Sequence, residues 1–363
     1  MSSAGDREPI GPGRPLRSAA VLPSALAFGG AAIGGLYESV SEDQAQRTVK
    51  RALGLGLRYL DTAPHYGLGV SERRLGRALQ DLPRDSYAVS TKVGRLLRPL
   101  APGETAPDEG FSTAERLKRV WDFSRDGILR SMQESLERLG LDRVDILYLH
   151  DPDDFESEVY ATGYPTLAEL RSEGAVGAIG AGMNQAEMLT RFVRRLDLDV
   201  VLIAGRYSLL EQSALAELLP TCLDRGVGVV VGGAFNGGLL ADPAQGAIYN
   251  YSEASRQLVE RAISMRDVCA RHGVPLAAAA LQFPLGHPAV VSVLVGARSA
   301  AEVDQNARAF ATPVPPETWD ELKAEGLLAA EVPVPAQVPV PAEVPVPAEV
   351  PVPAEVPVPD ECP

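Results

Sequence analysis

Cysteine is rare in this chain, and long apolar runs are missing from it. The three cysteines, Cys222, Cys269 and Cys362, lie far apart with no CxxC pair or Cys/His cluster, so the sequence predicts neither a disulfide framework nor a metal site. No apolar run approaches the roughly 20 residues that a membrane helix needs, and the Arg-containing N-terminus lacks the apolar stretch of a signal peptide. We therefore expect a cytoplasmic protein without a membrane segment.

Basic residues are also in short supply. Lys and Arg total 34 against 48 Asp and Glu, which gives a formal net charge of −14. A nucleic-acid partner would need clustered Lys and Arg for its phosphates, so the composition argues against one. Six of the negative charges belong to residues 331–363, which hold no base. The remaining −8 is ordinary for a cytoplasmic enzyme.

The two ends of the chain differ in composition from its middle. Residues 1–22 are rich in Gly, Pro, Ser and Arg, and we expect a flexible N-terminal arm there. Residues 331–363 repeat Val-Pro-Val-Pro every six residues, and such alternate prolines favour an extended, disordered tail of the kind that SH3-like or WW-like partners bind. Residues 23–330 are then expected to form one domain around a large core.

Strand-like segments alternate with helical patterns through this middle part. The strands are expected near residues 26–29, 57–62, 87–93, 144–150, 176–182, 200–205, 227–233 and 290–297. Eight such units predict an α/β fold, a (β/α)8 TIM barrel, with a doubly wound sheet as the alternative. Segments end near Asp61, Lys92 and His150, and Tyr66 follows the first of them. Because a parallel barrel collects its strand ends at one face, we expect these four side chains to share an active site there.

Several motifs resemble the aldo-keto reductase family. They are Gly56 to Gly76, beginning Gly-Leu-Arg-Tyr-Leu-Asp-Thr-Ala; Ser90-Thr91-Lys92; Leu136-Glu137-Arg138-Leu139-Gly140 followed by Asp145 and His150; and Ile179 to Asn184. The resemblance covers roughly residues 20–327. Within the family, Trp121 to Gly127 and Ala204 to Tyr207 look most like the branch of D-threo-aldose 1-dehydrogenases and L-fucose dehydrogenases, and pyridoxal 4-dehydrogenases are similar in the same places.

The resemblance implies an NAD(P)-dependent oxidoreductase with a catalytic tetrad. Tyr66 would exchange a proton with the substrate oxygen, and Lys92 would bring the pKa of that phenol closer to neutrality. Asp61 would hold the Lys92 ammonium by an ion pair. His150 would orient the substrate oxygen by hydrogen bonding.

The resemblance also implies residues for the nicotinamide cofactor. These are Asn184, Gly296, Arg298, Ser299, Gln305 and Asn306, of which the later ones resemble a motif whose backbone amides take a phosphate at a helix start. Glu302 stands where many relatives place an Arg on the 2′-phosphate of NADP, so NAD is at least as acceptable as NADP, although Arg298 could compensate. The aromatic that stacks on the nicotinamide in many relatives would fall near Gly232, and we expect Phe235 to replace it.

An insertion of about 30 residues, Gly94 to Arg125, separates the Lys92 strand from the next helix. Long loops in compact barrels are usually functional or disordered. This one leaves the Lys92 strand, so we expect a lid over the pocket, with a solvated surface excursion as the alternative. Arg95, Arg98 and Trp121 offer hydrogen-bond donors and a flat apolar face, which together suit a pyranose.

These features predict a small-molecule substrate. The leading hypothesis is hydride transfer between C1 of an aldose, of the L-fucose or D-threo-aldose type, and NAD or NADP, giving a sugar lactone. The same tetrad would also serve oxidation of pyridoxal or general reduction of aldehydes and ketones. A non-catalytic regulatory subunit that only binds the cofactor is the remaining alternative, and the intact tetrad speaks against it.

Overall fold

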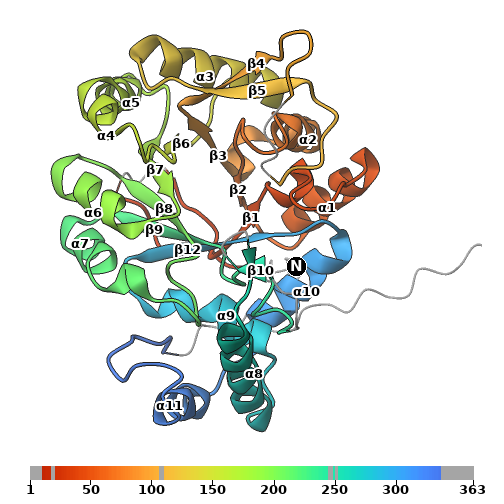
Figure 1. The fold of residues 1–363 in the computed structure, drawn as a ribbon, viewed down its shortest axis with the longest axis vertical. Helices are drawn as coiled ribbons and strands as arrows, with labels where there is room; N and C mark the ends of the chain where they lie inside the picture. The colour runs from red at the N-terminus through yellow and green to blue at the C-terminus, as the bar shows by residue number, and fades with distance from the viewer. Residues whose placement is uncertain (1–9, 18–20, 106–109, 244–247, 250–251, 337–363) are drawn as a thin grey trace, which may run out of the picture.

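Eight parallel strands close into a barrel in the order β1-β12-β9-β8-β7-β6-β3-β2. The computed structural model describes residues 10–17, 21–105, 110–243, 248–249 and 252–336. Helices surround the strands (Figure 1), and β1 pairs with β12, so the barrel closes on itself. The predicted (β/α)8 TIM barrel is confirmed.

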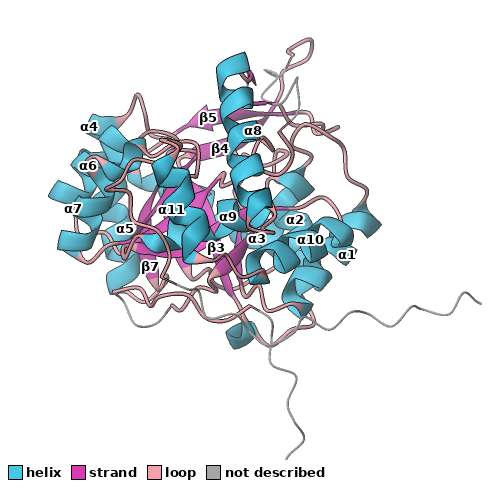
Figure 2. Cartoon of the chain, turned by 90° about the horizontal axis from the view of Figure 1, so that it is seen from below, coloured by secondary structure: helices cyan, strands magenta, loops and turns pink. Residues whose placement is uncertain are grey.

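The elements alternate along the chain as the sequence predicted. The barrel strands are β1 (Leu26–Gly29), β2 (Tyr59–Asp61), β3 (Ala88–Val93), β6 (Ile146–His150), β7 (Ala178–Met183), β8 (Val200–Ala204), β9 (Gly228–Gly232) and β12 (Val290–Gly296). The longer helices are α1 (Glu42–Gly54), α2 (Val70–Leu79), α3 (Arg125–Leu139), α5 (Tyr164–Ser172), α6 (Ala186–Arg195), α7 (Leu218–Arg225), α8 (Arg256–Arg271), α9 (Leu276–Gln282), α10 (Ala300–Ala311) and α11 (Pro316–Ala324). Helices α8 and α11 pack against each other outside the ring (Figure 2). None of the helices in the described ranges is both long and apolar enough to cross a membrane.

Four of these helices have a serine as their N-cap residue. Ser41, Ser124, Ser255 and Ser299 each accept a hydrogen bond from a backbone N–H in the first turn of α1, α3, α8 and α10. This bond satisfies one of the donors that a helix start leaves unpaired. Helix α3 ends at Gly140, whose φ of 65° lies in the left-handed region that favours glycine.

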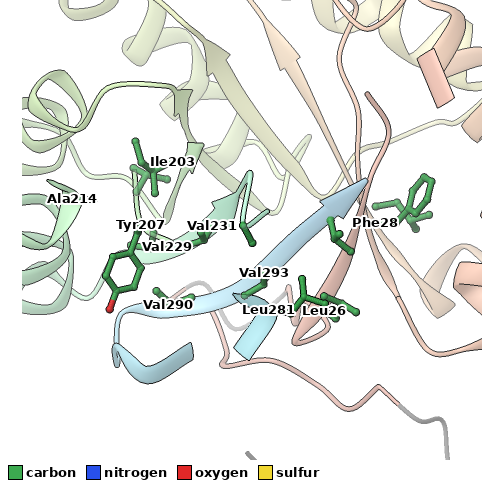
Figure 3. Close-up of a cluster of buried hydrophobic side chains, with 14 of the residues drawn as sticks. Leu26, Phe28, Ile203, Tyr207, Ala214, Val229, Val231, Leu281, Val290 and Val293 are labelled. Carbon is green, nitrogen blue, oxygen red and sulfur yellow. The ribbon is translucent and has the colours of Figure 1, made fainter. Parts of the chain in front are cut away.

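The two-residue period of the strands divides the core into an inner and an outer part. Tyr59, Tyr148 and Leu202 belong to the cluster inside the barrel, whereas their chain neighbours pack outward beneath the helices. Figure 3 shows part of that outer cluster, with Leu26, Phe28, Val229, Val231, Val290 and Val293 on three adjacent strands. Because the period continues to the strand ends, the same inward alternation brings polar side chains to the carboxyl face of the barrel.

Part of the predicted N-terminal arm lies against the amino end of the barrel. The Arg14 guanidinium donates to the backbone oxygens of Leu285, His287 and Val290. Leu16 is 4% exposed and belongs to the inner cluster. Residues 10–17 therefore close the amino end of the barrel, while residues 1–9 and 18–20 lie outside the described ranges.

The start of the predicted tail also touches the barrel. Val332 is 3% exposed, and Val334 packs against the outer core. Gly286 faces this segment so closely that a Cβ there would lie 2.7 Å from the Val334 carbonyl carbon. The rest of the Val-Pro repeat, residues 337–363, lies outside the described ranges.

The predicted loop between residues 94 and 125 contains regular structure. Strands β4 (Arg95–Pro99) and β5 (Leu117–Trp121) form an antiparallel hairpin, and β4 packs against α3. In Figure 1 this hairpin projects beside α3 at the edge of the molecule. The short strands β10 (Ile248–Tyr249) and β11 (Ser252–Glu253) pair antiparallel between β9 and α8.

Candidate active site

The four predicted catalytic side chains come together at the carboxyl face of the barrel. Asp61, Lys92 and His150 lie at or near the ends of β2, β3 and β6, and Tyr66 reaches them from the loop after β2. That loop needs a glycine at Gly67, which has a φ of 64°. A Cβ there would stand 2.1 Å from the Gly34 carbonyl oxygen, so a larger residue would displace the segment that carries Tyr66.

The Lys92 ammonium has an acceptor for each of its three protons. Its Nζ lies 2.6 Å from Asp61 Oδ2, 3.0 Å from the Thr62 carbonyl oxygen and 3.0 Å from the Tyr66 hydroxyl oxygen. Lysine has three donors and no acceptor, so Tyr66 must accept from Lys92. The hydrogen of the Tyr66 hydroxyl is thereby left to point elsewhere, toward the cavity.

Burial disfavours the charged forms of Lys92 and Tyr66. Burial lowers the pKa of Lys92, but Asp61 and Tyr66 outweigh it and leave that pKa raised. Burial also raises the pKa of Tyr66 to about 12, against the opposing effect of the Lys92 ammonium. The sequence predicted the sign of the Lys92 effect on the phenol but not the larger effect of burial, which disfavours the phenolate.

His150 is held neutral beside Tyr66. The two rings meet edge to face at a centroid distance of 5.9 Å. Burial, reinforced by Arg95 and Lys92, lowers the pKa of His150 well below its usual value. Its Nδ1 is buried without a hydrogen-bond partner, while its Nε2 lies 3.5 Å from Asp151 Oδ2. A carboxylate beside Nε2 favours the tautomer with the proton on that nitrogen.

A charged and aromatic rim surrounds the tetrad. Arg95 donates to Asp151 Oδ2 and bonds His65 Nδ1 at 3.1 Å, and its guanidinium lies 4.2 Å from the centroid of the Trp121 ring. Phe111 stacks on Tyr66 with an interplanar angle of 24°. A cavity of about 330 Å³ opens between this rim and the tetrad, lined by Tyr66, Lys92, His150, Asp151, Phe111 and Asn184 among others.

A second cavity of about 320 Å³ adjoins the first and shares Tyr66, Asn184 and Ala204 with it. Seven glycines are among its lining residues, namely Gly29, Gly205, Gly232, Gly233, Gly237, Gly238 and Gly296. They leave bare backbone along a groove that reaches Tyr66. Phe235, which the sequence suggested as the ring beside the nicotinamide, also lines this groove.

The other predicted cofactor residues lie around the start of α10. Gly296 lines the groove, and Asn306 Nδ2 donates to the Gly296 carbonyl at 3.4 Å. Ser299 accepts from the Glu302 N–H at 3.2 Å, and Glu302 Oε2 accepts from the Arg298 N–H at 2.9 Å. Two amides of this helix start are thus already paired within the chain. Gln305 is exposed on the same helix.

The three predicted substrate residues separate into two groups. Arg95 contacts the Trp121 ring and bonds His65 and Asp151, two residues that line the cavity beside the tetrad. Arg98 instead pairs with Glu134 of α3 at 2.9 Å, and none of Arg95, Trp121 and Arg98 is among the residues that line the two cavities described above. Alternation along β4 accounts for this difference, because residues three apart point to opposite faces of a strand.

The sequence did not predict three residues of the rim, His65, Phe111 and Asp151. His65 precedes Tyr66 in the loop after β2, and Asp151 directly follows His150 at the end of β6, so their places next to predicted catalytic residues were a usable signal. Phe111 gave no signal, because it lies in the insertion and reaches Tyr66 only through the fold of the polypeptide between β4 and β5.

Comparison with known proteins now decides the family. Residues 25–325 match the model of the "Aldo/keto reductase family". The chain belongs to this family. The aldo-keto reductase is 46% identical over 310 residues to D-threo-aldose 1-dehydrogenase from a Pseudomonas species, covering 84% of this chain and 94% of that relative. It is 38% identical over 335 residues to pyridoxal 4-dehydrogenase from Microbacterium luteolum, covering 87% and 98%.

A solved structure agrees with this assignment. An aldo-keto reductase from Bacillus halodurans, in its holo form, superposes with a TM-score of 0.69 at 27% identity, covering 89% of this chain and 98% of that chain. The chain is therefore an oxidoreductase of a family that uses nicotinamide cofactors. Within the described ranges, no three His, Cys, Asp or Glu side chains gather in a way that would hold a metal ion.

Proposed function

We propose that this aldo-keto reductase oxidises the C1 hydroxyl of an aldose to a lactone and reduces a nicotinamide nucleotide. The observation that carries the proposal is the charged pair of Arg95 and Asp151 beside Phe111, above a complete Asp61, Tyr66, Lys92 and His150 tetrad. The 46% identity to a D-threo-aldose 1-dehydrogenase supports the same substrate class.

The rim has the chemistry that a pyranose needs. The side chains of Arg95 and Asp151 are 10% and 20% exposed. Asp151 lines the cavity, and Arg95 bonds both Asp151 and His65, which also lines it. A carboxylate accepts hydrogen bonds from sugar hydroxyls, and a guanidinium donates to them. Phe111 adds an apolar surface for the C–H face of the ring.

The tetrad then handles the proton of the C1 hydroxyl. Because Lys92 donates to the Tyr66 oxygen, a Tyr66 phenolate is stabilised where it would take that proton. The proton on His150 Nε2 is available to the same substrate oxygen. This hydrogen bond would hold C1 of the sugar beside Tyr66, Asn184 and Ala204, which line both cavities. When bound, the oxidised nicotinamide supplies the hydride acceptor and a positive charge that lowers the pKa of a nearby phenol. In the reducing direction, Tyr66 returns the proton.

NAD is proposed as the preferred nucleotide. The Glu302 carboxylate is fixed at the start of α10 by the Arg298 N–H, and its charge would repel the 2′-phosphate of NADP. The Arg298 side chain lies near a second acid, with its Nε 3.8 Å from Glu38, so part of its charge is already compensated.

A cytoplasmic location is part of the proposal. Cys222 and Cys269 are buried, free thiols, and burial raises their pKa to about 12 and about 11. Structural thiols of this kind suit a reducing compartment.

Pyridoxal oxidation is the second candidate function. The 38% identity to a pyridoxal 4-dehydrogenase favours it, and the aromatic rim of His65, Phe111 and Trp121 would also pack against a flat pyridine ring.

The test is nucleotide reduction with L-fucose, D-arabinose and pyridoxal, using both NAD and NADP. We expect turnover of a sugar with NAD, and Asp151→Asn should raise the KM for that sugar by roughly 10-fold or more, as loss of a hydrogen bond to a charged group would. The control is Asp154→Asn, an exposed acid in the same loop, which should leave KM unchanged. Activity with pyridoxal alone would move the function to the second candidate.

A further inference from the structure

Three hydroxyl groups lie inside the barrel directly beneath the tetrad. They belong to Tyr59 of β2, Ser90 of β3 and Tyr148 of β6, and all three residues are 0% exposed. The Tyr148 and Tyr59 oxygens are 3.1 Å apart, and the Tyr59 and Ser90 oxygens are 2.9 Å apart. Ser90 Oγ lies 2.7 Å from Asp61 Oδ1. The hydroxyls therefore form a continuous chain that ends on a catalytic side chain.

The direction of each hydrogen bond in this chain follows from counting protons. An ionised Asp61 can only accept, so Ser90 must donate its single proton to Oδ1. Ser90 then accepts from Tyr59, because it has no second proton to give. Tyr59 has likewise used its proton, so it accepts from Tyr148. All three O–H groups point the same way, toward Asp61.

The three hydroxyl groups take the place of water around the buried Asp61 carboxylate. The side chain of Asp61 is 1% exposed, and its other oxygen, Oδ2, faces Lys92 at 2.6 Å. Hydrogen bonds aligned in one direction polarise one another in a low-dielectric interior. Ser90 thus draws negative charge toward Oδ1, and less of it remains to hold the Lys92 ammonium away from Tyr66.

We propose that Tyr148, Tyr59 and Ser90 are positioning residues that act through Asp61 to keep the Lys92 ammonium shared with Tyr66. The inference rests on the proposed roles of Lys92 and Tyr66 but not on the sugar. It assigns a function to polar side chains in the barrel interior, where apolar residues of similar shape would otherwise pack.

The effect is measured at Tyr66, and other titratable and charged groups lie around it. Asp61, Lys92 and Asp151 act on Tyr66 directly. The neutral rings of His65 and His150 contact Tyr66, and Arg95 and Arg119 act on those two rings. Asp61 raises the pKa of Tyr66 and Lys92 lowers it. Weakening the hydroxyl chain leaves the other charges in place and strengthens only the unfavourable effect of Asp61.

The kinetic test is the pH profile of oxidation in the variants Ser90→Ala, Tyr59→Phe and Tyr148→Phe. Oxidation uses the Tyr66 phenolate as its base, so its rate should rise with pH. The midpoint of this rise should move upward by about one pH unit for Ser90→Ala and by about half a unit for Tyr59→Phe, as expected for loss of one hydrogen bond. Tyr148→Phe, which is farthest from Asp61, should give the smallest shift. The dissociation constant of the nucleotide should stay within about two-fold of wild type in all three.

Two buried hydroxyls serve as matched controls. Tyr207 is 0% exposed and Ser131 is 1% exposed, and neither hydroxyl has a hydrogen-bond partner. Tyr207 lies in the outer cluster (Figure 3) and Ser131 lies on α3. Tyr207→Phe and Ser131→Ala remove the same atoms as the test variants, and they should leave the midpoint where it is.

A second measurement needs neither nucleotide nor substrate. The chain has four lysines, Lys50, Lys92, Lys118 and Lys323, so protein labelled with 13C at lysine Cε gives four resonances, and Lys92→Arg assigns one of them. That resonance should move in Ser90→Ala and Tyr59→Phe and stay fixed in both controls. A fixed Lys92 resonance in Ser90→Ala would overturn the proposal, as would equal midpoint shifts in test and control variants. Because this readout is independent of turnover, a wrong substrate assignment cannot be mistaken for failure of the role proposed for the three hydroxyl groups.

Discussion

The phenol of Tyr66 has one hydrogen bond from Lys92 and one open direction, toward the cavity. Replacing it by Phe removes the proton-transfer group and leaves the glycine-lined groove intact. Tyr66→Phe should therefore lower turnover by roughly 10²–10⁴-fold, with the nucleotide dissociation constant within a few-fold of wild type. Steady-state kinetics and fluorescence titration of the nucleotide check the two parts. Turnover above about a tenth of wild type would remove Tyr66 as the acid and base.

The two histidines of the pocket should not titrate near neutral pH. Burial and nearby cations lower the pKa of His65 to about 2 and that of His150 well below its usual value. Both rings stay neutral wherever the pH exceeds these lowered values. The pH profile of kcat/KM should then show no inflection near 6.5, the ordinary value for histidine.

Folding stability gives an independent check on the same two rings. The unfolded chain binds protons at these histidines below about pH 6.5 and the folded chain does not, so their contribution to stability is present above that pH and is lost as the pH falls. The melting temperature of His150→Asn should accordingly depend less on pH between about 5.5 and 7.5 than that of wild type. An inflection near pH 6.5 in wild-type kinetics that disappears in His150→Asn would contradict the prediction.

The tetrad was predictable from the sequence for a physical reason. Parallel strands deliver their last residues to one face, so Asp61, Lys92 and His150 converge whatever the detailed packing. The net pKa of Tyr66 was not predictable, because it depends on how deeply the ring is buried. Phe111 was not predictable either, since its place depends on the long polypeptide between β4 and β5.

At the scale of elements, the β4–β5 hairpin has two faces with different tasks. One face presents Arg95 to Asp151 and His65, and the other presents Arg98 to Glu134 of α3. Arg95→Ala should raise the KM for the substrate by roughly 10-fold or more through loss of charged hydrogen bonds. Arg98→Ala should leave the kinetic constants within about two-fold, because a partly exposed ion pair contributes at most about 1 kcal/mol.

Arg98→Ala is the matched control for Arg95→Ala, because both variants remove an Arg from β4. Steady-state kinetics with each candidate substrate and a melting curve for each variant are the measurements. Equal changes in KM would show that the hairpin acts only as a scaffold. The sequence predicted a lid here, with a solvated surface excursion as the alternative. The hairpin was not predicted, because neither strand shows regular alternation of apolar and polar residues.

At the scale of the whole molecule, the packed part of the chain extends past the predicted boundaries at both ends. Truncation after residue 336 should leave the free energy of unfolding unchanged, whereas truncation after residue 330 should lower it by about 1.5–3 kcal/mol, the value for burying one Val side chain. Denaturant unfolding of the two truncated proteins beside the full chain measures both. Equal stability of the two truncations would show that Val332 contributes nothing. The change in composition allowed the Val-Pro repeat to be recognised from the sequence. It could not show that Val332 is packed, because Val332 has the same local sequence as the later copies of the repeat.

The contact between Arg14 and the start of β12 has a consequence for synthesis of the protein. Arg14 and Val290, which its guanidinium contacts, are 276 positions apart in sequence. Strand β1 likewise pairs with β12, the last strand of the barrel to be synthesised. On the ribosome, the first strand emerges long before the last one has been translated. The nascent barrel therefore remains an open sheet with two unpaired edges for most of translation, and ring closure is a late, long-range step with a high entropic cost. An aldo-keto reductase with this connectivity should need protection from aggregation until its final quarter has left the exit tunnel.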